Sequence, residues 1–165
     1  MKNKIAFIVD STTIVPEEFV QAFRYEQVSL HVMIEGKEER ELDLKDEDII
    51  SRLESTKNLK SSSPSTGEFL LALEKLFSEG YEDIIIMTMS KENSTTYNVA
   101  NMAIDSLDDD QKNHVYNVDT NINNYGITNI LIALSYWRDK DISGKDLAAK
   151  ANIYCHDSHL AFTLL

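Results

Sequence analysis

The sequence predicts an α/β domain built on a mostly parallel sheet with helices on both faces. Short continuous apolar runs, such as IAFIV at residues 5–9 and DIIIMTM at residues 83–89, are typical of buried strands. Each run is followed by a polar loop and then by a helix-like segment, and this alternation favours a parallel sheet. The length of 165 residues suits one domain, which we expect to cover residues 1–165.

The elements can be placed in order along the chain. The first strand, at 5–9, ends at Asp10, and Pro16 with its acidic neighbours favours a short helix over 16–23. Gly80 is placed to end a helix that follows Gly67. Apolar spacing and turn residues predict the other elements: a strand at 28–33, a turn at 35–37, a helix at 44–53, a helix at 67–77, a strand at 83–89, a helix from residue 94, a strand at 114–118, and helices at 125–137 and 145–155, with a last strand at 160–165.

Composition and charge exclude several classes of protein. The formal net charge is -12, and acidic residues cluster between Glu35 and Asp48 and again at 108–110. Nucleic acids and anionic membrane surfaces are bound by clustered Lys and Arg, so neither is an expected partner. No apolar run is long enough to span a membrane. The single cysteine, Cys155, fits a reducing compartment and a small buried side chain, so we expect a cytoplasmic protein without disulfides.

Hydroxyl and amide side chains gather where the predicted strands end. In parallel sheets ligands bind beyond the carboxyl ends of the strands, and the loops at those ends are residues 10–13, 90–97 and 119–121. A fourth stretch, SSSPST at 61–66, leads directly into a helix and carries five hydroxyls in six positions. Hydroxyls and N–H groups at a helix start can hold an anion, although plain helix capping would use the same residues.

The same loops lack groups that break bonds. None of the four histidines lies in them, and no nucleophile elbow, phosphate-binding loop or dinucleotide fingerprint is present. His156 and His159 are three residues apart without further ligands, which favours exposed side chains over a metal site. We therefore expect a site that binds and does not react, with no metal and no cofactor.

Four motifs in order give the sequence a family resemblance. They resemble motifs of the DegV family. IAFIVDSTTIVPEEF is similar to the opening strand of the family, and SSSPSTGEF to its Thr-Ser-Gln-Pro-Ser loop. MSKENSTTYNVA is similar to the Ser-Gly-Thr-Tyr segment, and NVDTNINNYGI to the strand that ends in Asp-Ser. The resemblance runs from residue 5 to about residue 160. DegV proteins bind a long-chain fatty acid, and some present it to a kinase that makes acyl-phosphate. The resemblance thus implies a non-enzymatic lipid-binding protein, with a fatty-acid kinase subunit as a partner.

The resemblance also implies the residues of the site. In the family, hydroxyls of the second and third motifs hold the carboxylate and a tunnel holds the acyl tail. Carried over by position, these hydroxyls are Ser61, Ser62, Ser94 and Thr96, and the first loop adds the ligand-binding candidates Asp10 and Ser11. Thr95 stands where the family has glycine.

The resemblance also leads to an expectation about the domains of this chain. Family members usually carry a second, carboxy-terminal domain that supplies part of the tunnel, and we expect this domain to be absent from this chain. The apolar side left open would then require a partner or a homodimer.

One alternative function is a phosphotransfer or dihydroxyacetone-kinase-like module that uses a histidine such as His31. The other is a protein-interaction domain in which Thr95 blocks the pocket.

Overall fold

The computed structural model describes residues 4–34, 36–45, 47, 50–51 and 59–159. Its centre is a parallel sheet of four strands in the order β2-β1-β6-β7, formed by β1 (Ile5–Asp10), β2 (Arg24–Val28), β6 (Asp83–Met87) and β7 (Val115–Val118). Every residue of β1 is buried, because β2 and β6 flank it and helices cover both faces. The predicted α/β class is therefore confirmed.

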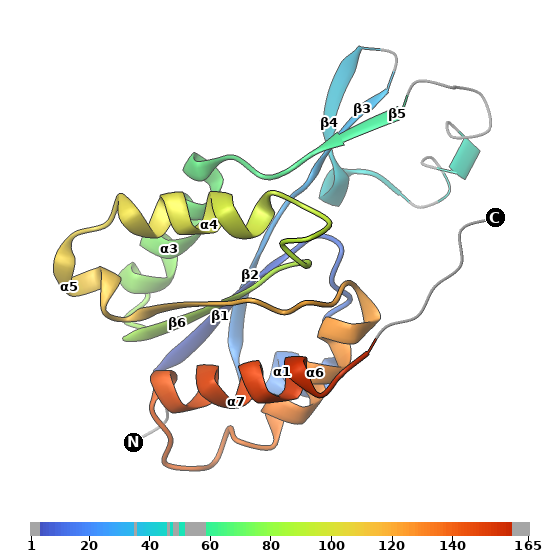
Figure 1. Cartoon of the computed structure of the whole chain (residues 1–165). Coiled ribbons are helices and arrows are strands. Elements are labelled where there is room, and N and C mark those ends of the chain that lie inside the picture. Colours follow the sequence, from blue (N-terminus) through green and yellow to red (C-terminus); the bar gives the residue numbers. More distant parts are fainter. Residues whose placement is uncertain (1–3, 35, 46, 48–49, 52–58, 160–165) are drawn as a thin grey trace.

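Helices lie on both faces of this sheet (Figure 1). On one face, α3 (Thr66–Ser78) and α4 (Thr96–Asp105) pack over Ala6, Ile8 and Ile86. On the other face, α1 (Glu17–Ala22), α6 (Tyr125–Ser135) and α7 (Gly144–His156) pack over Phe7, Val9 and Met87. Alternate side chains of each central strand thus pack into two separate cores, as the two-residue period of a strand requires. The short helix α5 (Asp109–Lys112) joins α4 to β7.

A second sheet projects from the body of the domain (Figure 1). It is antiparallel, with the order β4-β3-β5, and consists of β3 (His31–Ile34), β4 (Lys37–Arg40) and β5 (Leu59–Ser62). Gly36 has a positive φ of 82° at the hairpin between β3 and β4, where the sequence predicts a turn. A 3-10 turn, η1 (Glu41–Asp43), follows β4.

The second sheet corrects two predictions. The single strand predicted at 28–33 is two strands in different sheets, because Ser29 turns the chain between them: its hydroxyl donates to the Leu30 carbonyl (2.8 Å) and accepts from Leu42 N–H (3.1 Å). The apolar alternation runs through both strands and conceals the break. The hydroxyl stretch is likewise part strand, since Ser61 and Ser62 belong to β5. Half of the residues of the helix predicted at 44–53, and all of those of the strand predicted at 160–165, lie outside the described residues.

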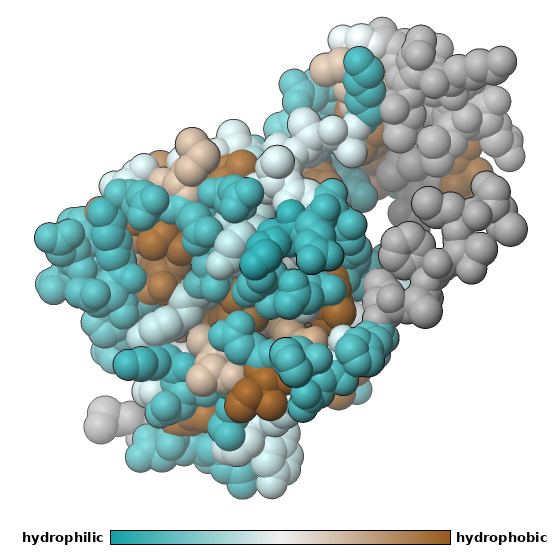
Figure 2. Space-filling model, in the orientation of Figure 1, coloured by the Kyte–Doolittle hydropathy of each residue, from teal (hydrophilic) through white to brown (hydrophobic). Residues whose placement is uncertain are grey.

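The surface of the domain is mainly polar. Figure 2 shows teal side chains over most of the face in view, with brown apolar side chains in separate small areas. Among the described residues, no helix has both the length and the apolar content to cross a membrane. Cys155 is buried, and burial raises the pKa of its thiol to about 12, so it is a core side chain as predicted.

Gly144 gives a test of the packing at the start of α7. A Cβ at this position would lie 2.3 Å from Asp83 Cβ, while the Gly144 N–H already donates to Asp83 Oδ2 (2.9 Å). We expect Gly144→Ala to lower the free energy of unfolding by about 2 kcal/mol, because α7 must shift away from β6. At Gly67 in α3 a Cβ would meet only Ser65 Oγ, at 3.9 Å, so Gly67→Ala should be neutral or stabilising by up to ~1 kcal/mol. Urea unfolding of both variants checks the contrast, and equal effects would contradict it.

Candidate functional site

The candidate site lies at the carboxyl ends of β1 and β6. There the loop that leaves β6 leads into α4, and the end of β5 leads into α3. The small sheet stands beside both loops, so Ser61, Ser63, Ser94 and Thr95 meet although about 30 residues separate the two pairs. The sequence-predicted hydroxyls Ser61, Ser62 and Ser94 all line one pocket here.

Asp10 joins two of the loops and makes no contact with that pocket. Its carboxylate is fully buried, and Oδ1 accepts from Thr12 N (3.1 Å) and from the hydroxyls of Thr12 (2.5 Å) and Thr13 (3.4 Å). Oδ2 accepts from Met89 N–H (2.6 Å), which lies in the loop after β6. Burial raises the pKa of Asp10, against the hydrogen bonds of Thr12 and Met89. Because both oxygens are occupied, Asp10 positions the loops and offers nothing to a ligand.

Ser11 joins the parallel sheet to the small sheet. Its hydroxyl accepts from Leu30 N–H (2.9 Å) and donates to the Glu41 carboxylate, while its N–H donates to the Val28 carbonyl (2.9 Å). Ser11 is thus committed to holding the start of β3 near the end of β1. The two predicted candidates of the first loop are therefore neighbours of the pocket and do not line it.

Hydroxyl groups from two loops form a continuous chain at the pocket. Ser63 Oγ lies 2.7 Å from Thr95 Oγ1 and 3.4 Å from Ser94 Oγ. Ser94 Oγ lies 2.8 Å from Thr96 Oγ1 and accepts from Thr96 N–H (3.2 Å). Thr96 is fully buried beneath this chain. Four hydroxyls from β5, α4 and their loops therefore converge, which the resemblance implied only for Ser94 and Thr96.

The pocket has a volume of about 430 Å³ and a neutral lining. Its lining residues are Leu30, Ser61, Ser62, Ser63, Met89, Asn93, Ser94 and Thr95, and none of these carries a charge. The Ser61 side chain is exposed and has no hydrogen-bond partner within the described part of the chain, so its O–H is free to donate. The Ser62 hydroxyl instead reaches Glu38 (3.4 Å).

The two helix starts beside the pocket differ. At α3 the Ser65 hydroxyl accepts from Glu68 N–H (3.3 Å) and the Glu68 carboxylate accepts from Ser65 N–H (2.8 Å), so the helix caps itself. At α4 the N-cap residue Thr95 makes no side-chain cap, because its hydroxyl is turned to Ser63. Of these two helix starts, only that of α4 lacks a side-chain cap.

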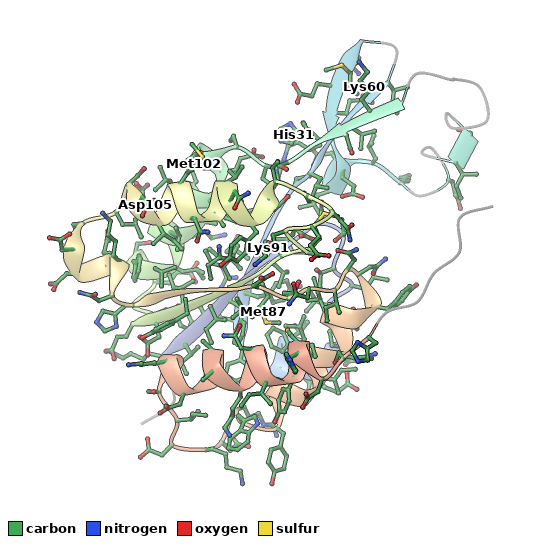
Figure 3. All side chains as sticks on the ribbon, in the orientation of Figure 1. His31, Lys60, Met87, Lys91, Met102 and Asp105 are labelled. Atoms are coloured by element: carbon green, nitrogen blue, oxygen red, sulfur yellow. The ribbon has the colours of Figure 1, made fainter. Side chains whose placement is uncertain are left out.

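His31 ties the small sheet to α3. Its Nε2 lies 3.0 Å from Glu68 Oε1 and its Nδ1 lies 3.2 Å from Glu38 Oε1 (Figure 3 shows His31 at the base of the sheet). The hydrogen bond to Glu68 raises the pKa of His31. Burial acts to raise the pKa of Glu68, but hydrogen bonds from Ser65 and His31 outweigh it and the pKa is lowered. When His31 is protonated, the two side chains therefore form an ion pair.

The loop after β7 does not reach the pocket. The Thr120 hydroxyl donates to the Thr88 carbonyl (2.7 Å), and Asp119 pairs with Lys91 of the neighbouring loop (Figure 3 labels Lys91). These contacts fasten the exits of β6 and β7 together. His156 and His159 are both exposed, and no cluster of metal-binding side chains occurs among the described residues.

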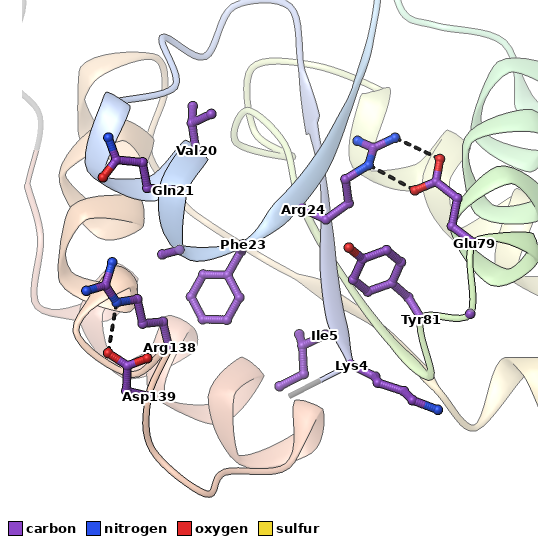
Figure 4. A pocket seen from close by; sticks show the side chains of 12 residues that line it. Lys4, Ile5, Val20, Gln21, Phe23, Arg24, Glu79, Tyr81, Arg138 and Asp139 are labelled. Atoms are coloured by element: carbon purple, nitrogen blue, oxygen red, sulfur yellow. Dashed lines mark hydrogen bonds and ion pairs between the residues drawn. The ribbon is translucent and has the colours of Figure 1, made fainter. Parts of the chain in front are cut away.

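A larger hollow of about 730 Å³ lies at the opposite edge of the sheet (Figure 4). It is formed around the amino ends of β1 and β2, and its charged side chains pair with one another: Arg24 with Glu79 (2.9 Å) and Arg138 with Asp139 (2.9 Å). Since these charges are already satisfied and the edge is the one that ligands of parallel sheets avoid, we do not assign the site there.

Five of the eight residues that line the pocket were not among the site residues predicted from the sequence. Ser63 lay within the quoted hydroxyl stretch but was not chosen, and Thr95 was treated as an obstruction. Nothing in the sequence indicated a binding role for Leu30, Met89 and Asn93, because an apolar or amide residue is common after any strand. Only the turn of the small sheet brings Leu30 to the site.

Comparison with known proteins places the chain in a family. A family model described as "Uncharacterised protein, DegV family" matches residues 4–164. The chain belongs to the DegV family. A DegV domain-containing protein of Listeria innocua is 36% identical over 110 residues, which are 66% of this chain and 39% of that protein. One from Staphylococcus aureus is 33% identical over 107 residues, or 64% of this chain and 38% of that protein.

Solved DegV structures share the fold. A DegV lipid-binding protein of Thermotoga maritima is 25% identical with a TM-score of 0.78, over 95% of this chain and 55% of that chain. A Thermus thermophilus DegV family protein, described by its fatty-acid binding, gives a TM-score of 0.78 at 19% identity, over 95% and 54% of the two chains. The chain therefore spans about half the length of these solved relatives.

Asp10 gives the first prediction for the site. We expect Asp10→Ala to lower the free energy of unfolding by about 2–3 kcal/mol, because Met89 N–H and Thr12 N–H lose their buried acceptor. Asp105→Ala, at an exposed position of α4 (Figure 3), is the control and should change it by less than about 0.5 kcal/mol. Urea unfolding at neutral pH measures both, and equal values would show that the Asp10 contacts carry no stability.

His31 gives a pH-dependent prediction. Because its pKa is raised on folding, its charged form stabilises the fold in full below the unfolded pKa of about 6.5, and this contribution is lost as pH rises through the folded pKa. Glu68 stays ionised across this range because its pKa is lowered. His31→Gln should therefore cost about 1 kcal/mol at pH 6 and less at pH 9. Urea midpoints at the two pH values test this, and a loss independent of pH would contradict it.

Proposed function

We propose that this chain is the part of a DegV protein that holds the carboxylate of a long-chain fatty acid. The observation that carries the proposal is the neutral, hydroxyl-lined pocket at the uncapped start of α4. Support also comes from relatives, since solved DegV proteins of Thermotoga maritima, Thermus thermophilus and Bacillus subtilis are described as binding lipid or fatty acid. Those proteins are about twice as long as this chain, which covers 54–55% of each.

The head group would be held by neutral donors. A carboxylate in the pocket would accept from the free Ser61 hydroxyl and from the hydroxyl chain around Ser94, with the positive end of the α4 dipole beneath it. A hydrogen bond to a charged group contributes roughly 1.5–3 kcal/mol. Thr96 would support Ser94 from below and would not touch the ligand, because it is fully buried.

The acyl tail would account for most of the affinity. Each buried methylene contributes about 0.8 kcal/mol, so a tail of a dozen or more methylenes outweighs the head group. In this pocket only Leu30 and Met89 are apolar, which is too little surface for a long tail. The proposal therefore assigns the rest of the tunnel to surface that the longer relatives possess or to a partner, which includes a second copy of this chain.

A binding role without catalysis follows from the same lining. The pocket contains no histidine, carboxylate or lysine that could transfer a proton, so a fatty acid held here would be chemically unchanged. We extend the proposal to a cytoplasmic protein that presents the fatty acid to a kinase subunit. The phosphotransfer alternative is weakened by His31, whose two ring nitrogens both face carboxylates.

The test is uptake of oleate by the full chain, followed by native mass spectrometry and by displacement of a fluorescent fatty acid. The double variant Ser61→Ala with Ser94→Ala should bind oleate about 10- to 100-fold more weakly, as the loss of charge-assisted hydrogen bonds requires. Ser106→Ala is the matched control, because this exposed serine lies at the other end of α4 and bonds only Met102 O (2.9 Å). If the double variant and the control bind oleate equally well, the carboxylate is held elsewhere.

A further inference from the structure

Hydrogen-bond counting fixes the direction of the buried end of the hydroxyl chain at the pocket. Each hydroxyl has one O–H to donate and two lone pairs to accept. Thr96 is fully buried, and within the described residues its hydroxyl has Ser94 Oγ as its partner (2.8 Å). A buried donor without an acceptor is costly, so Thr96 must donate to Ser94.

The next hydrogen bonds of the hydroxyl chain follow from this donor assignment. Ser94 Oγ already accepts from Thr96 N–H (3.2 Å), so the Thr96 hydroxyl fills its second lone pair and leaves Ser94 only its own O–H to offer. That O–H points to Ser63 Oγ at 3.4 Å. Ser63 Oγ lies 2.7 Å from Thr95 Oγ1, and either hydroxyl can be the donor. The chain continues in one direction when Ser63 donates, and the O–H of Thr95 is then the one left over.

The last O–H belongs to Thr95. Thr95 is exposed and lines the pocket, and when Ser63 donates to it, its own O–H has no acceptor among the residues that the structure describes. Its position as N-cap of α4 would allow it to bond its own helix, yet that cap is not made. The chain of hydroxyls thus ends in a single donor that faces the pocket.

We propose that Thr95 is a specificity-determining head-group donor, whose O–H is oriented by the relay from Thr96 through Ser94 and Ser63. The inference rests on the proposed function and names a residue of the same site. A donor polarised in this way selects a ligand that accepts, such as a carboxylate, over a neutral head group of equal tail length. Thr95 is then a binding residue, and the alternative in which it blocks the pocket predicts the opposite effect.

The experiment compares oleate and oleyl alcohol binding to the full chain and three variants. Thr95→Val keeps the shape and removes the O–H, so oleate should bind about tenfold more weakly and the preference for oleate over oleyl alcohol should shrink. Thr95→Ser keeps the hydroxyl and should stay within about twofold of the wild type. Ser63→Ala removes the relay and should weaken oleate binding as well, and the pair Ser63→Ala with Thr95→Val should be no weaker than Thr95→Val alone.

Each outcome decides a separate question. A wild-type chain that binds oleate, with Thr95→Val unchanged or tighter, overturns this inference and leaves the proposed function standing. Additive losses for Ser63 and Thr95 overturn the relay, because independent contacts add. A wild-type chain that takes up no oleate overturns the proposed function and this inference with it. Circular dichroism of each variant separates loss of binding from loss of fold.

Discussion

The site depends on the buried carboxylate of Asp10. It holds the exits of β1 and β6 together, because its two oxygens accept from the Thr12 and Met89 N–H groups of different loops. Met89 lines the pocket, and the loop that it begins leads to Ser94 and Thr95. Next to it, Ser11 fastens the small sheet through Leu30, which lines the pocket from the other side. A buried side chain that does not line the pocket therefore sets the distance between residues that do.

This arrangement explains how a strongly acidic chain can offer a site to an anion. The formal net charge is -12, yet the carboxylates nearest the pocket are already engaged: Glu41 with Ser11, Glu68 with His31, and Glu38 with His31 and Ser62. Because these carboxylates are engaged and none of them lines the pocket, the lining is neutral and includes hydroxyl groups beside the N-terminus of α4. Neutral donors bind a carboxylate less strongly than a cation would, so the apolar tail has to decide affinity while the hydroxyls decide orientation.

The sequence was sufficient to predict the parallel sheet but insufficient to predict the small antiparallel sheet. Runs such as IAFIV and DIIIM are buried on both faces and cannot be read in another way, and the capping glycine after α3 adopts the expected positive φ (88° at Gly80). The strand predicted at 28–33 failed because hydrophobic alternation carries no information on which sheet a strand joins. Ser29 makes that assignment, and the bond that its hydroxyl accepts from Leu42 N–H is a tertiary contact that local composition does not reveal. The pocket lining divided in the same way: the family resemblance implied Ser61, Ser62 and Ser94, while Leu30 and Met89 needed the fold.

The residues at the pocket also show why a hydroxyl-rich loop cannot be interpreted one serine at a time. Ser65 and Ser63 are two positions apart in the same stretch, but Ser65 closes a capping box with Glu68 whereas Ser63 faces Thr95 across the pocket. Ser65 stabilises its own helix and needs no ligand; Ser63 connects two elements that the sequence keeps far apart. The buried Pro64 separates the two serines: β5 ends before it, at Ser62, and Ser65 directly after it is the N-cap of α3. The hydroxyl residues of this loop that line the pocket, Ser61, Ser62 and Ser63, therefore all precede Pro64, whereas Ser65 belongs to the helix start.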